Sequence, residues 1–175
     1  MTGSAVSAGE DLAAVVRSVH RAYPSGLSIV TTLENGQPQG LAVSAFSSVS
    51  LDPPTVMVLV AYTSSNHNRF YTAETLCINL VSTDQVAVAR RFATSGGDKF
   101  AGVDWHVGPH GAPILDDSIG HFEIAVQERI LAHTHTMFIG RVLGAGFRQE
   151  ATPLIYVRGR FFDGGNLAEL EGEAK

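Results

Sequence analysis

The hydrophobic pattern at the start of the chain has a helical period. From Leu12 to Val19, apolar side chains recur at helical spacing, which predicts a helix that Pro24 ends. These apolar residues are Leu12, Val15, Val16 and Val19. Ser7 and Glu10 stand three positions apart just before this run, which is the spacing of a capping box at a helix N-terminus.

After this helix the period changes to two, which is typical of strands. Leu27 to Thr32 predicts a first strand, the Asn35-Gly36 pair predicts a hairpin turn, and Gln39 to about Phe46 predicts a second strand. Pro53-Pro54 then breaks the pattern. Thr55 to Tyr62 is a continuous apolar run rich in β-branched residues, which predicts a buried strand.

The rest of the chain mixes short helical and strand patterns. Residues 66–72 and 83–92 have the pattern of helices. Further strands are predicted at 76–81, 122–126, 137–141 and 154–162. Many strands at short spacing with few helices predict a mainly β fold, an antiparallel β-barrel with peripheral helices. A parallel Rossmann sheet is less favoured, because strands and helices do not alternate regularly.

The composition indicates one globular domain. The chain has 175 residues, 45% of them apolar and 17% charged, which is enough to bury a hydrophobic core. We assign this domain to residues 10–163, a flexible N-terminus to 1–9 and an acidic tail to 164–175. The net charge of −5, without a run of Lys or Arg, argues against a nucleic-acid partner.

The apolar runs, the first residues and the cysteine content indicate in which compartment to expect the protein. No apolar run is long enough to cross a membrane, and the first residues lack the pattern of a signal peptide. Cys77 is the single cysteine, which excludes an internal disulfide and favours a small buried residue. We therefore expect a cytoplasmic protein that does not bind membranes.

The usual motifs for nucleotide binding and nucleophilic catalysis are missing from the sequence. No Gly-x-Gly-x-x-Gly opens a helix, and there is no P-loop and no Gly-x-Ser-x-Gly elbow. His133 and His135 are two positions apart on a predicted strand, so both rings would point to one face, as in half of a metal site. No spacing supports a third ligand from His106, His110 or His121, so we favour structural or substrate-contacting histidines and no metal.

The stretch GLAVSAFSSVSLDPP, residues 40–54, carries four serines on what otherwise resembles a core strand. Small residues allow a flat ligand to lie close to the backbone, and amide and hydroxyl groups at a strand end can hold a phosphate. The alternative is an edge strand with solvated serines.

Two other segments offer similar groups. Thr63-Ser64-Ser65-Asn66 precedes a predicted helix, and Asp98-Lys99-Phe100 places one positive charge beside an aromatic ring. Together these segments predict a cradle for a phosphorylated, planar cofactor.

These segments, taken in order, resemble the flavin reductase domain family, small NAD(P)H:flavin oxidoreductases that supply reduced flavin to two-component monooxygenases. The matching segments are YPSGLSIVTT from Tyr23, GLAVSAFSSVSLDPP from Gly40, TSSN from Thr63, CINLVSTDQ from Cys77, RRFATSGGDKFAGVDW from Arg90, GAPIL from Gly111, HTHTMFIGRV from His133 and PLIYVRGRF from Pro153. They cover about residues 16–162. The resemblance implies an FMN-binding split β-barrel, usually a homodimer, that uses FMN or FAD with NADH or NADPH.

The resemblance also implies a set of site residues. The flavin-binding residues would be Ser25, Gly26, Ala42, Val43, Ser44, Ala45, Ser47, Ser48, Ser64, Asn66, Phe92, Lys99, Tyr156 and Arg158. Within this set, residues 42–45 would face the isoalloxazine ring with backbone groups, and Ser47 and Ser48 would meet the ribityl and phosphate part. Ser64, Asn66 and Lys99 would contact the phosphate. His135 would help to place the nicotinamide.

The sequence departs from the family pattern around this histidine. The family has Gly-Asp-His where this chain has His133-Thr134-His135, so the glycine and the acidic residue are replaced. Hydride transfer from nicotinamide to flavin needs no protein nucleophile and no strong acid, which agrees with the missing motifs. We therefore assign His135 an orienting role.

Two other functions remain open from the sequence. The first is a flavoprotein that keeps FMN tightly bound and acts on an organic substrate of its own. The second is a non-catalytic protein, either a flavin-binding dimer or a dimeric scaffold. Consumption of NADH or NADPH on addition of free flavin separates these alternatives from a flavin reductase.

Overall fold

The structure is a computed structural model that describes residues 11–169. The predicted capping box at Ser7 and Glu10, and the predicted flexible N-terminus, lie outside these residues. The helices are α1 (Leu12–Ala22), α2 (His67–Thr72) and α3 (Val86–Ala93), with 3-10 turns η1 (Thr83–Gln85) and η2 (Gly164–Asn166). The first strands are β1 (Ser25–Gly26), β2 (Ser28–Glu34), β3 (Gln37–Val43), β4 (Phe46–Leu51), β5 (Pro54–Ala61) and β6 (Thr75–Leu80). The later strands are β7 (Trp105–Val107), β8 (Pro113–Leu115), β9 (Gly120–Ala132), β10 (His135–Phe147), β11 (Leu154–Val157) and β12 (Arg160–Asp163).

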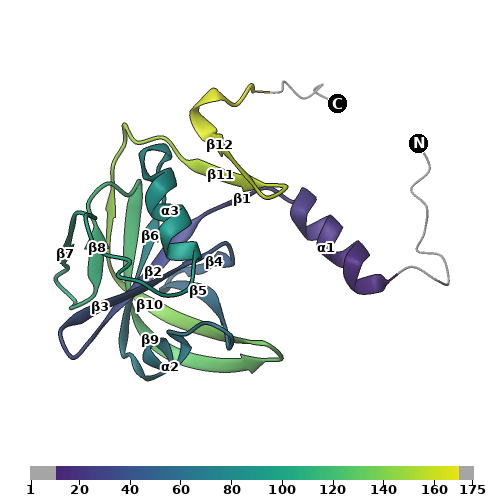
Figure 1. Ribbon diagram of the computed structural model, residues 1–175. Coiled ribbons are helices and arrows are strands. Elements are labelled where there is room, and N and C mark those ends of the chain that lie inside the picture. The colour runs from purple at the N-terminus through teal and green to yellow at the C-terminus, as the bar shows by residue number, and fades with distance from the viewer. Residues whose placement is uncertain (1–10, 170–175) are drawn as a thin grey trace.

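Most of these strands form one large sheet (Figure 1). Its seven strands are all antiparallel and follow the order β3-β2-β6-β9-β10-β5-β4. Two small sheets, β1-β11-β12 and β7-β8, lie beside it. The predicted mainly β, antiparallel fold is confirmed. The large sheet is open, because no hydrogen-bonded ladder joins its edge strands β3 and β4.

The two edge strands of this sheet are consecutive in the chain. Only Ser44 and Ala45 connect β3 to β4. Across a flat sheet of seven strands the edges would lie about 29 Å apart. Two linking residues span only about 10 Å. The sheet therefore curves until its edges meet at one corner, which we call the Ser44–Ala45 corner. The expectation of one continuous strand from Gln39 to Phe46 is wrong, because the chain turns here from one edge to the other.

The hydrophobic core lies on both faces of β2. On one face Val30 belongs to a buried cluster with Val58, Phe70 and Phe138, inside the curved sheet. On the other face Ile29 belongs to a second cluster, with Phe92, Phe100, Leu115 and Leu154. Because both faces are covered, the polar residues of β2 are buried as well as the apolar ones. Strand β2 is therefore buried on both faces, between the two clusters. Its alternating sequence is that of a strand with only one buried face.

Gly40, on β3, allows the second cluster to pack directly against the backbone. A Cβ atom at this position would lie 2.4 Å from Cε1 of Phe92 and 3.3 Å from Cζ of Phe100. Phe92 is itself buried, so its ring has little room to move. We expect Gly40→Ala to lower the free energy of unfolding by about 1–3 kcal/mol through overpacking. Urea denaturation checks this value, with Gly26→Ala as control, because a Cβ at Gly26 meets no atom within 4 Å. Equal stability of the two variants would contradict the prediction.

Two other sequence expectations are wrong in detail. The predicted strand at 154–162 is a hairpin of β11 and β12, because Arg158 and Gly159 adopt positive φ angles of 53° and 76° and form its turn. His133 does not share a strand face with His135. It lies in the turn between β9 and β10 with φ of 51°. In both cases a short turn stands where the alternation of apolar residues alone predicts a continuous strand.

Other expectations are confirmed. Cys77 is fully buried, and burial raises the pKa of its thiol, which makes it a structural residue. The helix before Pro24 ends at Ala22, and the Asn35-Gly36 pair forms the β2–β3 turn. Between residues 11 and 169, none of the helices has the length and apolar character needed to span a bilayer.

Candidate functional site

The Ser44–Ala45 corner opens into a cavity of about 500 Å³, which we call the corner cavity. Ser25, Ser44, Ala45 and Tyr156 line it, although they come from distant parts of the sequence. Strand β1 brings Ser25 here, because Ser25 pairs with Tyr156 in the small sheet. The structure therefore brings together four of the residues that the sequence predicted for the flavin.

An adjoining cavity of about 420 Å³ shares Tyr23, Ser25 and Ser44 with the corner cavity. Its remaining wall is largely apolar and includes Leu80 and Leu154. The predicted residue Gly26 also lines it. An apolar crevice with a few polar groups is the usual environment for a planar organic ring.

The backbone at the corner carries two hydrogen-bond donors without a partner. Among the hydrogen bonds of residues 11–169, neither the amide of Ser44 nor that of Ala45 has an acceptor. The carbonyl of Ala45, by contrast, accepts from the amide of Leu59 at 3.1 Å. Both residues are exposed, and their side chains are small. A flat ligand can therefore reach these two amides.

A third cavity, of about 230 Å³, lies farther along β3 and carries hydroxyl groups. We call it the hydroxyl cavity. Its lining includes Ala42, Thr63, Ser64, Phe92 and Lys99. Ala42 and Ala45 are three residues apart, which is about 10 Å along an extended chain. This is a suitable separation between the ring and the phosphate of a flavin mononucleotide.

Lys99 supplies the positive charge of the hydroxyl cavity. Its Nζ donates to the carbonyls of Phe92, at 3.2 Å, and of Gly40, at 3.4 Å. Partial burial lowers the pKa of this ammonium group below its usual value, because the charged form is desolvated. The predicted phosphate contact Asn66 is buried and donates to the same Gly40 carbonyl at 3.2 Å. Asn66 thus holds β3 and α2 together, while Ser64 lines the cavity itself.

Several predicted residues lie away from these cavities. Ser47 and Ser48 belong to β4, where Ser47 pairs with Met57, four residues before the end of β5. Ser64 follows the end of β5 at Ala61, which is about 13 Å along this strand from Met57. The side chain of Val43 is buried in the core, which leaves only its backbone for a ligand. Arg158 is exposed in the β11–β12 turn, next to the cavity-lining Val157.

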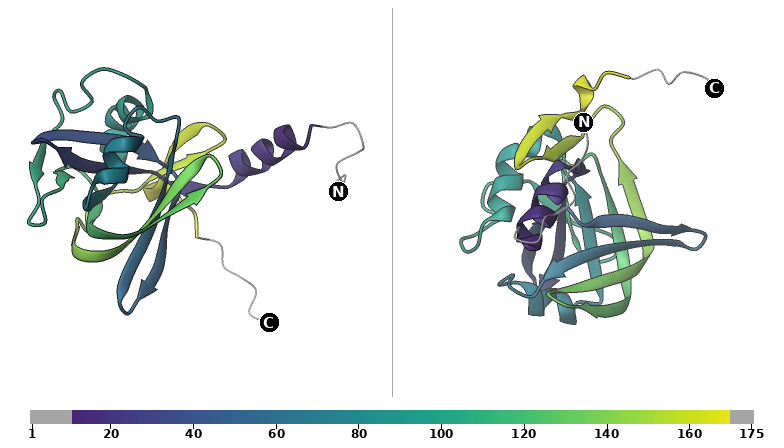
Figure 2. Two further views of the ribbon diagram at one scale, coloured as in Figure 1. Left: turned by 90° about the horizontal axis from the view of Figure 1, so that it is seen from below. Right: turned by 90° about the vertical axis from the view of Figure 1, so that its right-hand side faces the viewer.

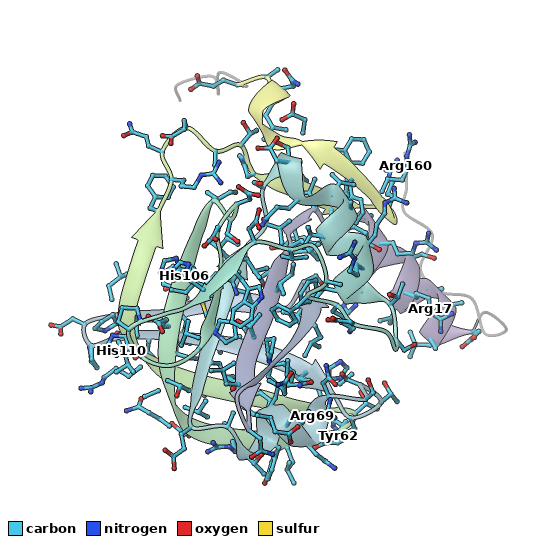
Figure 3. The ribbon with its side chains drawn as sticks, turned by 60° about the vertical axis from the view of Figure 1, so that its left-hand side comes forward. Arg17, Tyr62, Arg69, His106, His110 and Arg160 are labelled. Carbon is cyan, nitrogen blue, oxygen red and sulfur yellow. The ribbon has the colours of Figure 1, made fainter. Side chains whose placement is uncertain are left out.

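His135 and the histidines considered as a third ligand lie at different ends of the β9–β10 hairpin. His121 is the second residue of β9, whereas His135 lies past the opposite end of that strand, about 35 Å away along the hairpin. In Figure 3, His106 and His110 lie at the left of the molecule, whereas Tyr62 and Arg69 lie in its lower part. No group of three metal-ligating residues is found in the part of the chain from 11 to 169. His135 pairs with Ala61, which lines the hydroxyl cavity, and its Nδ1 lies 2.9 Å from Oγ1 of Thr134.

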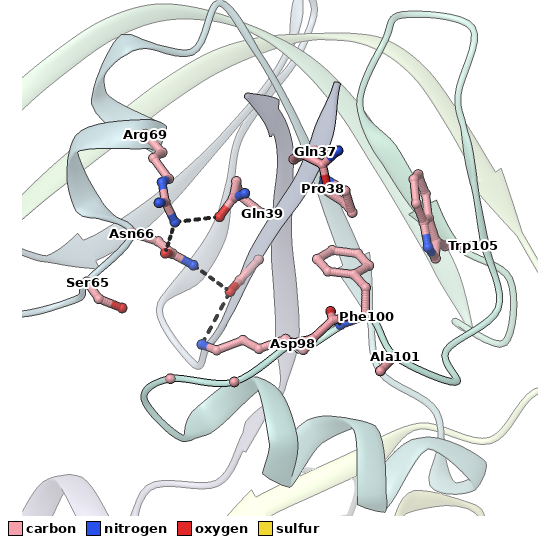
Figure 4. Close-up of a pocket in the computed structure, with 14 residues that line it drawn as sticks. Gln37, Pro38, Gln39, Ser65, Asn66, Arg69, Asp98, Phe100, Ala101 and Trp105 are labelled. Carbon is pink, nitrogen blue, oxygen red and sulfur yellow. Dashed lines mark hydrogen bonds between the residues drawn. The ribbon is translucent and has the colours of Figure 1, made fainter. Parts of the chain in front are cut away.

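Sequence reasoning missed some residues of the site. Tyr23 lines two of the cavities, and Thr63 lines the hydroxyl cavity. Both lie in the segments YPSG and TSSN, so extending the prediction to their neighbours finds them. Arg69 and Trp105 line a fourth cavity, shown in Figure 4. Arg69 is detectable because it follows Asn66 by three positions, on the same helix face.

Comparisons with known proteins agree with this geometry. Residues 19–165 match the family described as "Flavin reductase like domain". The reductase subunit HsaB of a flavin-dependent monooxygenase from Rhodococcus jostii (strain RHA1) is 32% identical over 145 residues, which cover 83% of this chain and 74% of HsaB. An NADH:FMN oxidoreductase of Rhodococcus qingshengii is 34% identical, with 83% of this chain and 79% of the relative covered. The chain spans only 47% and 64% of two further curated relatives from Rhizobium meliloti (strain 1021).

Among solved structures, the NADH:FAD oxidoreductase SgcE6 of Streptomyces globisporus C-1027, in complex with NAD and FAD fragments, superposes with a TM-score of 0.81. The two chains are 28% identical, and the match covers 94% of this chain and 96% of SgcE6. The family match extends from the last turn of α1 through β12 and includes every cavity described above. The chain therefore belongs to the flavin reductase like domain family.

Proposed function

We propose that the protein is an NAD(P)H-dependent flavin reductase that reduces FMN or FAD. The observation that carries this proposal is the Ser44–Ala45 corner, where two small exposed residues present backbone amides with no acceptor among residues 11–169, beside an apolar cavity. The sharply curved open sheet around it is a split β-barrel, and the flavin enters at the split. The names of the relatives, an NADH:FMN oxidoreductase and an NADH:FAD oxidoreductase, support the same activity.

The residues of the site bind and orient two cofactors. When both are bound, the nicotinamide nucleotide would supply the hydride, and solvent the proton, for reduction of the flavin. The amides of Ser44 and Ala45 would stabilise the negative charge of a reduced ring in the corner cavity by donating hydrogen bonds to it. The corner would also hold the two rings close together, which would raise the rate. No protein side chain has to accept or donate the hydride.

His135 orients the nicotinamide in this proposal. We expect His135→Ala to raise the KM for the reduced nicotinamide nucleotide by about tenfold, because the variant loses one hydrogen bond to a polar partner. Flavin affinity should stay within about twofold. Steady-state kinetics and flavin titration check the two values separately. A variant that loses flavin affinity and keeps its nicotinamide KM would show that His135 belongs to the flavin site instead.

Lys99 makes flavin binding dependent on pH. The ammonium group is charged below its pKa, and that pKa is lowered from 10.5 by desolvation. As the pH rises toward 10.5, Lys99 therefore loses its charge before an exposed lysine does. We expect the Kd for FMN to increase over this interval, because an uncharged amine attracts the phosphate less. Titrations of FMN at several pH values measure the effect.

Two controls separate this effect from other alkaline titrations. Riboflavin has no phosphate, so its Kd should not follow the charge of Lys99. In Lys99→Gln the pH dependence of FMN affinity should be absent. If FMN and riboflavin respond to pH in the same way, Lys99 does not hold the phosphate.

The decisive experiment is turnover with free flavin. Oxidation of NADH or NADPH on addition of FMN or FAD is followed by the loss of nicotinamide absorbance. We expect many turnovers per protein chain. Flavin that copurifies tightly without such turnover supports a flavoprotein with its own organic substrate, and the absence of flavin affinity supports a non-catalytic dimer.

Three further properties complete the proposal. The partner that uses the reduced flavin is a flavin-dependent monooxygenase, as the name of the Rhodococcus jostii relative suggests.

The protein is a homodimer, because α1 projects from the body with no buried residue (Figures 1 and 2). The helix and the residue after it expose apolar side chains, with Leu12, Val19 and Tyr23 exposed by 64%, 63% and 74%. A second copy would cover this apolar stripe, and Val19→Asp would then shift the mass in solution to that of a monomer. The location is the cytoplasm, where NADH is produced.

A further inference from the structure

A large cavity of about 570 Å³ adjoins the hydroxyl cavity (Figure 4). We call it the outer cavity. Both cavities are lined by Ser65 and Lys99, so a ligand can pass from one to the other beside the same ammonium group. The outer cavity is within the size range of sites for small organic ligands. The proposed binding of flavin mononucleotide makes no use of it.

One wall of the outer cavity carries a second cation, Arg69. Its Nη1 donates to Oε1 of Gln39 at 2.7 Å and to Oδ1 of Asn66 at 2.9 Å. Its Nε lies 2.8 Å from a carboxylate oxygen of Glu34. These three partners hold the planar guanidinium at the cavity wall. These contacts use the N–H groups of Nε and Nη1, and the Nη2 group remains to donate a charge-assisted hydrogen bond to a phosphate oxygen.

The opposite wall is aromatic. Phe100 and Trp105 lie with ring centroids 5.5 Å apart, and Pro38 continues this surface from β3. The Gly96-Gly97 loop forms the rim of the cavity near Lys99, and both glycines have positive φ angles, of 79° and 71°. A side chain would be strained at either position. Because neither residue has a side chain, a ligand can approach the cavity across this part of the rim. An aromatic wall opposite an arginine is a suitable surface for a heterocyclic base joined to a phosphate.

We propose that the outer cavity binds the adenylate half of FAD, so that this reductase prefers FAD to FMN. The proposal rests on the proposed function, because the flavin phosphate in the hydroxyl cavity marks where the adenylate begins. The second phosphate of FAD lies between Lys99 and Arg69, and the adenine lies against Trp105. FMN leaves the outer cavity empty and gains nothing from it.

The first test uses the protein without any flavin. Trp105 is the single tryptophan of the chain, so its fluorescence reports on the outer cavity alone. We expect adenosine 5′-monophosphate to change this fluorescence in a saturable way, and adenosine, which lacks the phosphate, to bind more weakly. FAD should displace the nucleotide, whereas FMN should not. An unchanged fluorescence on addition of the nucleotide would overturn the proposal.

The second test compares FAD and FMN affinities in variants of Arg69. In the wild-type protein we expect FAD to bind about tenfold more tightly than FMN, as one charge-assisted contact to phosphate provides. Arg69→Gln should remove this preference and leave the Kd for FMN unchanged. Gln39→Glu should do the same with little change in shape, because it keeps the bond to Arg69 and adds to Glu34 a second carboxylate that repels the phosphate. Arg148→Gln is the control, since Arg148 is a half-buried arginine paired with Asp117 outside these cavities.

The outcomes distinguish this proposal from the proposed function. If the wild-type protein binds FAD and FMN equally, or if both Arg69→Gln and Gln39→Glu weaken the two flavins alike, the outer cavity does not bind the adenylate of FAD. If adenosine 5′-monophosphate competes with NADH and not with FAD, the cavity serves the nicotinamide nucleotide and the proposal is wrong. If neither flavin is reduced, the proposed function fails, while the fluorescence titration still decides whether the cavity binds an adenylate.

Discussion

Ser44→Trp should abolish flavin reduction while leaving the fold intact. Ser44 lines both the corner cavity and its apolar neighbour, so an indole at this position occupies the space for the flavin ring. The side chain of Ser44 is exposed, and its replacement therefore disturbs no core packing. We expect kcat/KM to fall by at least about a hundredfold, because a misplacement of about 1 Å already has an effect of this size. Flavin titration and turnover with NADH measure the loss.

A matched variant shows whether the position or the bulk of the tryptophan is responsible. Thr72 is exposed at the end of α2 and lines none of the four cavities of the site. Thr72→Trp should keep its activity within about twofold of the wild-type value, as is usual for surface substitutions. Circular dichroism confirms the fold of both variants. If Ser44→Trp is folded and still reduces flavin at the normal rate, the ring does not bind at the Ser44–Ala45 corner.

Asn79→Leu should cause the largest loss of stability. Asn79 is fully buried on β6 and makes hydrogen bonds to two other strands, β2 and β8. Its Nδ2 donates to the carbonyl of Ile29 and to Oγ1 of Thr31, both at 3.1 Å, and its Oδ1 accepts from the amide of Leu115 at 2.8 Å. Leucine has a similar volume but leaves these partners unsatisfied. We expect the free energy of unfolding to fall by about 3–4 kcal/mol, since each lost buried bond costs about 1 kcal/mol or more.

Chemical denaturation checks this value, with the slope of the transition as evidence that unfolding stays cooperative. Asn68→Ala is the control, because Asn68 is exposed on α2 and its substitution should change stability by less than about 0.5 kcal/mol. A loss below about 1 kcal/mol in Asn79→Leu would mean that water replaces the amide, so that Asn79 does not tie β8 to the sheet.

Much of the local structure was predictable because its signals are local. The helix before Pro24, the hairpin at Asn35-Gly36 and the strand after Pro53-Pro54 each depend on residues within a few positions of one another. The strands β7 and β8 were not predicted, because they are three residues long and depend on pairing with each other and on Asn79. Such pairings between distant segments leave no periodic pattern in a short stretch of sequence.

The candidate site was predictable only in part, and for a similar reason. The resemblance to flavin reductases pointed to Ser25, Ser44, Ala45 and Tyr156, and the structure brings these four together at one cavity. It also grouped Ser47 and Ser48 with the phosphate contacts. Their place on β4, beyond the corner, follows from a turn that the alternating sequence does not mark. The outer cavity with Arg69 and Trp105 was not predicted, since residues from β3, α2 and the 96–105 loop meet there.

The sequence by itself determined the family, the mainly β composition and the order of the strands along the chain. It did so because hydrophobic period, turn residues and motif order are properties of neighbouring residues. Only the tertiary structure decided which strands are neighbours and where the chain crosses from β3 to β4. The physical reason is the curvature of the sheet. Two small residues can connect opposite edges only if seven strands bend until those edges meet, and this bend creates the cavities in which we place the flavin.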